Sequence, residues 1–314
     1  MRQFAARRLL LMIPTLLLVT IVTFSLVRLI PGDVVTLMLQ EQQYAQDIAE
    51  LRHKLGLDIP IHEQYAKWMW GLFRGDFGVS LWTGRSMWDE FSHRIPVSFE
   101  LGILTMILSW IVSISIGVIA ALRQDTFIDY FLRIYAIGTA SIPSFWLATL
   151  IIVLPSIYFR WSPPLEWVPF TKDPLANLKM IAIPCLMVGL NGSAGMIRMV
   201  RAMLLEVLRQ DYIRTAWAKG LKESTIVFKH AMKNALIPVV TMFGGIIGGL
   251  IGGSVIIEQI FGLPGMGRFM LQVVNQRDYP MLQIINLFFA CIIVVSNLIV
   301  DLSYGWLDPR IRYR

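Results

Sequence analysis

The chain has 314 residues, of which 56% are hydrophobic and only 16% are charged, and its mean hydropathy is +0.62. Soluble domains are usually about 45–50% apolar and about 25% charged, so this composition argues against an ordinary water-soluble protein. The net charge of +7 is explained by basic loops beside anionic lipid, and we therefore expect no nucleic-acid partner.

Six charge-free runs are long enough to cross a membrane. They are Leu9–Val27, Leu101–Leu122, Ile134–Phe159, Met180–Ile197, Asn234–Ile257 and Tyr279–Val300. A helix needs about 20 apolar residues to cross ~30 Å of hydrocarbon, and a charge at its centre costs about 2.5–3.5 kcal/mol. None of the runs alternates between apolar and polar residues as a barrel strand does. The sequence therefore predicts an all-α integral membrane protein with six transmembrane helices.

The N-terminal segment 1–30 predicts an uncleaved first span, because its apolar run is long and no small-x-small cleavage site follows it. Residues 31–97 are too polar to span and predict a small helical insertion outside the membrane. We expect two short helices there, at 40–55 and 60–73, the second carrying several aromatic side chains suited to the outer membrane interface. The insertion serves either as a docking surface for an external partner or as a cap that seals the bundle.

The distribution of Lys and Arg predicts that both termini are cytoplasmic. With the first residues inside, the segments 1–8, 123–133, 198–233 and 301–314 carry 16 of the 28 Lys and Arg residues. Residues 98–304 then form a five-span core containing a cytoplasmic loop at 198–236, and 305–314 form a cytoplasmic tail.

Nothing in the sequence predicts catalysis or metal binding by this chain. The six runs contain no Asp, Glu, His or Lys, which secondary transporters usually keep at mid-membrane. The chain also has no G-x-x-x-x-G-K-[ST] loop that would hold ATP. We therefore expect no catalytic residue, no metal and no bound cofactor, and an energy source on another subunit. A self-sufficient six-span secondary transporter or channel is the alternative; a membrane-embedded enzyme is disfavoured because its spans would need clustered His, Asp or Glu.

The cytoplasmic loop 198–236 is the segment where another subunit could bind. Its pattern predicts a helix, a left-handed stop at Gly220 and a second helix, with Asp211 or Ser224 as candidate N-caps. One side of the first helix is apolar and is flanked by basic residues, which suits a groove on a partner protein. The apolar residues are Ile213, Ala216 and Trp217. An interfacial helix held by lipid headgroups is the alternative.

Polar and small residues within the runs mark a candidate translocation path. Paired glycines recur every four residues in the fifth run, which serves either tight helix packing or the path. The fourth run carries polar residues at membrane depth, and the third contains a proline where it could bend. The candidate path residues are Ser141, Pro143, Trp146, Asn191, Ser193, Gly245, Gly248, Gly249 and Gly252.

The stretch from Glu258 to Arg268 is rich in Gly and Pro and predicts an external re-entrant loop near the mouth of the path. Such a loop either senses substrate or plugs the pore. Its candidate residues are Phe261, Pro264, Gly265 and Arg268.

Several motifs resemble the dipeptide/oligopeptide/nickel branch of binding-protein-dependent ABC importer permeases. The stretch D-Y-I-R-T-A-W-A-K-G-L at 211–221, followed by H-A-M-K-N-A-L at 230–236, resembles that branch's form of the cytoplasmic coupling motif. The general motif E-A-A-x-x-x-G-x9-I-x-L-P is met with Arg214 and Thr215 in place of Glu and Ala, and with His-Ala-Met-Lys at its end. Segments 74–78, 258–268, 277–280 and 308–312 also resemble the branch, so the resemblance covers essentially the whole chain.

The resemblance implies a type I ABC importer permease, in the inner membrane of a prokaryote, that moves di- or oligopeptides by alternating access. It implies as partners a second homologous permease, two ABC ATPases that bind ATP and Mg, and an extracytoplasmic substrate-binding protein. The coupling helix would lie near 213–226. The coupling residues would be Arg214, Thr215, Ala216, Lys219, Gly220, Leu221, Lys222 and His230. Peptides are favoured over nickel because no cluster of His, Cys or Met marks the path.

Overall fold

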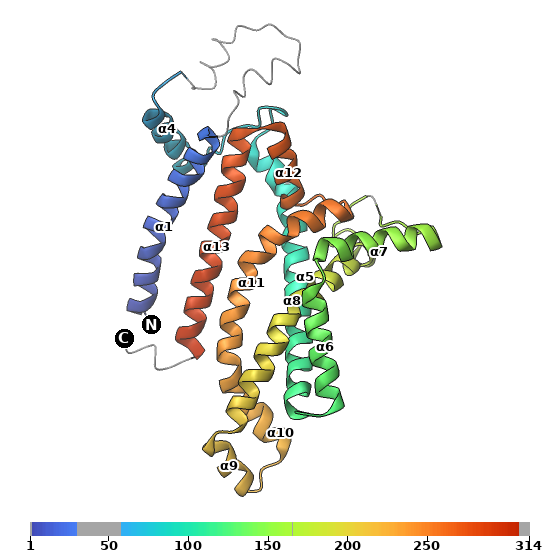
Figure 1. Cartoon of the computed structure of the whole chain (residues 1–314). Helices are drawn as coiled ribbons and strands as arrows, with labels where there is room; N and C mark the ends of the chain where they lie inside the picture. The colour runs from blue at the N-terminus through green and yellow to red at the C-terminus, as the bar shows by residue number, and fades with distance from the viewer. Residues whose placement is uncertain (1, 30–57, 165, 308–314) are drawn as a thin grey trace.

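A computed structural model describes residues 2–29, 58–164 and 166–307, and these fold as an assembly of long helices (Figure 1). The all-α class predicted from the sequence is confirmed. The elements are α1 (Arg2–Leu29), α4 (Ile61–Phe73), α5 (Met87–Leu122), α6 (Phe127–Ser141), α7 (Ser144–Phe159), α8 (Pro174–Leu208), α9 (Asp211–Ala218), α10 (Glu223–Thr225), the π-helix η1 (Ile226–Ala231), α11 (Met232–Phe261), α12 (Met266–Gln276) and α13 (Tyr279–Leu307).

Most of the predicted spans coincide with observed helices. Within the described part of the chain, α1, α5, α8 and α13 are each long and apolar enough to cross a membrane. The predicted run 234–257 lies inside α11, although the surroundings of residues 241 and 243–254 are outside the description. The predicted short helix at 60–73 is observed as α4, whereas the one at 40–55 lies outside the described residues.

The third predicted span, Ile134–Phe159, is observed as a bent pair of helices, and the proline at which a bend was expected lies at the break. It is divided into α6 and α7, which meet at 91°, and α7 projects sideways from the other long helices in Figure 1. The break falls at Ile142 and Pro143, between the two helices. Proline explains the break because it has no N–H for the helix ladder and its ring clashes with the preceding turn.

Local chemistry sets several helix boundaries. The Ser86 hydroxyl accepts a hydrogen bond from the Asp89 N–H at the start of α5. The Asp173 carboxylate accepts from two N–H groups in the first turn of α8, which opens on Pro174. At the other end of a helix, Gly262 adopts φ +68° and stops α11 in the left-handed conformation that glycine tolerates.

Helices α5 and α8 pack closely along one another in the centre of the molecule (Figure 1). Two glycines permit the contact, since a Cβ on Gly117 would lie 2.7 Å from the Val200 side chain and one on Gly189 would lie 2.7 Å from Leu108. The Ser109 hydroxyl also donates to the Gly189 carbonyl at 2.7 Å. This close backbone approach is typical of packed helices in membranes, and it makes α8 a rigid element.

The two ends of the molecule differ in character. Helices α9 and α10 lie at one end, whereas α4 and α12 lie at the opposite end (Figure 1). The beginning of α1 and the end of α13 both point toward the end that carries α9 (Figure 1), and Arg8 of α1 forms an ion pair with Asp301 of α13 at 2.9 Å. We call the end with α9 and α10 the α9 end, and the end with α4 and α12 the α12 end.

Candidate functional site

The α9 segment (residues 209–231) is attached to the end of α8 by buried apolar side chains. Ile213 and Ala216 of α9 and Ile226 of η1 are buried in one cluster with Leu204 of α8. The same cluster includes Ala235 near the start of α11. The segment therefore has a fixed position on both helices that flank it, and a displacement of α9 would be passed directly to α8 and α11.

The outer face of the α9 segment is exposed and carries aromatic and basic side chains. Its exposed residues include Tyr212, Arg214, Thr215, Trp217, Lys219, Lys222 and Phe228. Of the apolar side that was predicted to meet a partner, Trp217 is 49% exposed, whereas Ile213 and Ala216 are buried inside the chain and are not available to a partner. Since successive helical residues are rotated by about 100°, Trp217 points away from the face that Ala216 buries. Of the remaining candidate coupling residues, Leu221 and His230 are half-buried.

Of the predicted boundaries of the helices in the α9 segment, the stop at Gly220 is confirmed and the two N-caps are wrong. Gly220 has φ +73°, and its N–H donates to the Trp217 carbonyl at 2.9 Å, so it is the predicted left-handed stop. Asp211 and Ser224 do not cap the helices, which begin after Gln210 and Lys222 without a side-chain cap. Asp211 instead lies 3.3 Å from the exposed Arg214 guanidinium.

A buried ion pair that the sequence analysis missed joins α6 to α8 near the α9 end. Asp129 is fully buried and accepts hydrogen bonds from Arg201 Nε at 2.8 Å and Nη2 at 2.6 Å. The Asp125 N–H and the Arg133 guanidinium also face this carboxylate. Breaking such a pair by removing one partner costs about 3–5 kcal/mol. A single Asp in the first turn of an apolar helix is the sequence signal that could have indicated it.

The candidate path residues do not all share one environment. Ser141, Pro143 and Trp146 are exposed at the α6–α7 break, and the Asn191 side chain reaches the same break from α8. Ser193 is fully buried and donates to the Leu190 carbonyl of its own helix. The four candidate glycines belong to α11, and what surrounds them is not described.

The predicted re-entrant loop at 258–268 is wrong, because the chain forms a helix end, a tight turn and a new helix there. Glu258 is fully buried, and its carboxylate accepts from the Ser98 hydroxyl at 2.7 Å and from the Arg268 N–H at 2.9 Å. A carboxylate at the start of α12 is favourable because it meets free N–H groups and the positive end of the helix. Phe261 and Gly265 are buried, whereas Pro264 and Arg268 are exposed.

Asp278 attaches the region before α5 to the junction of α12 and α13. Its carboxylate accepts from the Ser80 hydroxyl at 2.6 Å and from the Leu81 N–H at 3.2 Å. Trp82 adds a hydrogen bond from its indole N–H to the Gln276 carbonyl at 2.7 Å. Burial raises the pKa of Asp278 above its usual range, and the hydrogen bonds act in the opposite direction. The sequence analysis missed this contact, since 198 residues separate Ser80 from Asp278.

The comparisons with known proteins point to one family. Residues 113–313 match the model of the family described as binding-protein-dependent transport system inner membrane component, and residues 1–102 match that of the corresponding N-terminal region. A putative peptide transport system permease of Brucella abortus is 40% identical over 301 residues, covering 96% of each chain. A di/tripeptide transport system permease of Pseudomonas aeruginosa and a dipeptide transport system permease of Escherichia coli are each 37% identical over the full length of both chains.

A likeness to solved structures supports the fold. A chain of the inward-facing MetNI methionine ABC transporter superposes with a TM-score of 0.56 at 14% identity, covering 69% of this chain and 95% of that one. A second crystal form of the same transporter gives a TM-score of 0.53 at 16% identity. At this level of identity the likeness concerns the arrangement of helices.

Proposed function

The chain belongs to the family of binding-protein-dependent transport system inner membrane components, and on that premise we propose that it is the permease subunit of an ABC importer for di- or oligopeptides. The observation that carries the proposal is the similarity, over the whole chain, to peptide permeases of several bacteria. Helices long and apolar enough to span a membrane supply the scaffold for transport. The chain itself contributes the path and the transmission of movement.

The α9 segment is the proposed contact with the ATPases. Its inner face is fixed to α8 and α11 by Ile213, Ala216 and Ile226, while its outer face presents aromatic and basic side chains. A short helix with one anchored face and one exposed face can lie in a groove of a partner protein. Movement of the partner would then act directly on α8.

The role of a permease subunit also implies the partners, the orientation and the transport cycle that we propose. The partners are a second homologous permease, two ABC ATPases that bind ATP and Mg, and an extracytoplasmic substrate-binding protein. The α9 end faces the cytoplasm together with both termini, and the α12 end faces outward. ATP binding would draw the two coupling segments together and open the bundle outward, and hydrolysis would reverse that change, so the two permeases rock around a central site.

The test is to purify the tagged chain gently from its native membrane and to identify the proteins that accompany it by mass spectrometry. We expect a second multi-span permease and one or two ATPases. After reconstitution with the binding protein, labelled di- and tripeptides should enter liposomes only when ATP is present on the ATPase side. Matched liposomes containing a non-hydrolysable ATP analogue are the control.

Two outcomes would overturn the proposal. Recovery of the chain alone, combined with solute movement that needs no ATP, would identify a self-sufficient transporter or channel. ATP-dependent uptake of a different solute class, with no competition by peptides, would keep the importer and reject the peptide assignment.

A further inference from the structure

The α6–α7 break leaves backbone carbonyls that need partners. In a continuous helix the N–H of residue 143 would bond to the carbonyl of Thr139, four residues earlier. Pro143 has no N–H and cannot make that bond. A carbonyl without a partner inside a bilayer costs free energy, because no bulk water is there to replace the lost donor. The bend is therefore tolerated only if another group supplies the hydrogen bonds.

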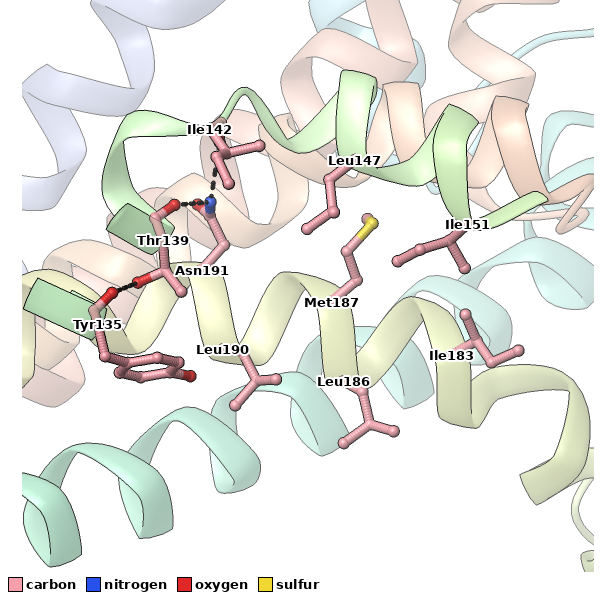
Figure 2. Close-up of a pocket in the computed structure, with 10 residues that line it drawn as sticks. All are labelled: Tyr135, Thr139, Ile142, Leu147, Ile151, Ile183, Leu186, Met187, Leu190 and Asn191. Carbon is pink, nitrogen blue, oxygen red and sulfur yellow. Dashed lines mark hydrogen bonds between the residues drawn. The ribbon is translucent and has the colours of Figure 1, made fainter. Parts of the chain in front are cut away.

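Asn191 of α8 supplies them. Its side-chain Nδ2 donates to the Thr139 carbonyl at 2.7 Å and to the Ile142 carbonyl at 3.2 Å. Figure 2 shows the amide reaching across from α8 to the point where the ribbon turns. One side chain thus bonds to the end of α6 and to the first residue of the break. These contacts hold the end of α6 and the residue before Pro143 against α8, and α7 begins directly after that proline.

Helix α8 also contacts α6 at a second point along its length. The ion pair of Asp129 with Arg201 holds the two helices near the α9 end, and Asn191 lies ten residues earlier in α8, which corresponds to about 15 Å along a helix. Helices fixed at two points move as one body. The last residue of α8, Leu208, is followed almost immediately by α9 at Asp211.

An apolar cavity of about 280 Å³ lies beside the break. Leu147 and Ile151 of α7 face Ile183 and Met187 of α8 across it, with Asn191 at one side (Figure 2). This space is partly open to the surface, so side chains of α7 have room to shift against α8. At this edge of the cavity, the hydrogen bonds of Asn191 hold the end of α6 and the break, from which α7 begins, against α8.

We propose that Asn191 is a positioning residue of the transport cycle, whose amide makes α7 follow the movement of α8 by holding the two carbonyls at the α6–α7 break. The proposal rests on the proposed transport function, because it assigns to α8 the movement that the ATPases impose on α9. It assigns Asn191 a role in transmission, distinct from contact with the transported solute.

The test compares Asn191→Asp with the wild type in the purified complex. Aspartate keeps the size of the side chain but replaces both N–H donors by an acceptor that faces carbonyl oxygens. Spin labels at Ile134 of α6 and Ser156 of α7, in a background without Cys185 and Cys291, report the angle at the break. Because α6, α7 and α8 should move together, we expect a narrow distance distribution that is the same with and without ATP in the wild type, and a broad distribution in the variant. Peptide uptake per ATP hydrolysed should fall about tenfold, in keeping with the loss of the hydrogen bonds to the Thr139 and Ile142 carbonyls.

Two variants separate positioning from stability. Thr149→Val removes a hydroxyl that bonds only within α7, and it should leave both readouts unchanged. Pro143→Ala restores the missing N–H, which can then bond to the Thr139 carbonyl. In that background Asn191→Asp should lower uptake by less than about twofold. The two substitutions are not additive because both residues affect the same acceptor. If Asn191→Asp alone does not assemble, recovery of the double variant supports the proposal and its absence overturns it.

A wild-type distance distribution in Asn191→Asp would overturn the proposal, as would an equal loss of uptake in both backgrounds. The distance measurement needs no peptide. A complex that shows the narrow distribution in the wild type and the broad one in the variant, yet takes up no peptide, would reject the substrate assignment and retain the role of Asn191.

Discussion

Glu258 lies at the end of α11 with its carboxylate against the backbone of the following turn, and Gly265 is the residue that leaves room for it. A Cβ on Gly265 would lie 2.4–2.6 Å from the carboxylate atoms. Gly265→Ala must therefore displace a buried carboxylate from the Ser98 hydroxyl and the Arg268 N–H. We expect a loss of about 1–3 kcal/mol, the usual effect of overpacking, measured as a lower midpoint of thermal unfolding in detergent.

The matched control is Gly102→Ala in α5. No atom lies within 4 Å of a Cβ placed on Gly102, and alanine is favoured over glycine in a helix by roughly 1 kcal/mol. This variant should be neutral or slightly stabilising. An equal loss in both variants would mean that the contact with Glu258 is not what excludes a side chain at Gly265.

Asp278 predicts a pH dependence with a defined sign. Its pKa is raised in the folded chain by burial, so the folded state holds the proton more tightly than the unfolded state. The free energy of unfolding therefore falls as pH rises from the unfolded pKa, near 3.9, through the raised folded value. Asp278→Asn keeps an acceptor for the Ser80 hydroxyl and should lack this slope. Thermal unfolding of both proteins across mildly acidic pH tests the difference, and parallel curves would contradict it.

At the level of elements, Gly220 serves the α9 segment through its backbone conformation. Its φ is +73°, and nothing lies within 4 Å of a Cβ placed there. A β-branched residue costs free energy in this conformation, whereas Asn adopts it readily. We expect Gly220→Val to reduce peptide uptake per ATP at least about tenfold, since the end of α9 would be displaced from the ATPase.

Gly220→Asn tests whether uptake depends on the backbone conformation of residue 220 or on the absence of a side chain there. If the left-handed backbone is what matters, this variant should retain uptake within about twofold of the wild type, because Asn tolerates αL. If both variants lose uptake while hydrolysis continues, then the ATPase approaches Gly220 so closely that no side chain fits. The measurement is uptake and hydrolysis in the same reconstituted sample.

Most of the long helices could be predicted from the sequence, because a helix that crosses lipid must be a long run of apolar residues. Long charge-free runs gave α1, α5, α8 and α13, and the stop at Gly220 followed from glycine's backbone freedom. A bend at Pro143 was considered possible, but its angle of 91° was not predicted. A proline in a membrane helix is compatible with a straight or a bent path, and the outcome depends on whether another helix supplies donors, as Asn191 does.

The site was predictable where it depends on local pattern and not where it depends on distant contacts. A partner-facing apolar side with basic neighbours was expected on α9, and Trp217 is exposed there, but Ile213 and Ala216 are buried by contacts with α8 and α11 that the local pattern does not reveal. Asp129 with Arg201, and Ser80 with Asp278, are each brought together by the folding of the whole chain. The sequence contained no information that paired them.

For the whole molecule, the two ends carry different contacts, and this difference defines a direction across the membrane. The α9 end holds the basic segment, whereas the α12 end holds the segment that Asp278 anchors. Lys and Arg are retained on the cytoplasmic side during insertion. The α9 segment should therefore face the cytoplasm, and residues near the start of α5 should face outward.

Cysteine labelling in intact cells tests this orientation. In a chain without Cys185 and Cys291, one cysteine is introduced at Ser92 in α5 or at Ser224 in α10, both of which are exposed. A membrane-impermeant maleimide should label Ser92→Cys in intact cells and Ser224→Cys only after the membrane is opened, since a charged reagent does not cross hydrocarbon. The reverse pattern would place α9 outside, where no ATPase could reach it, and would remove the basis for coupling through this segment. Labelling of both sites in intact cells would indicate a leaky membrane, which a cytoplasmic marker protein identifies.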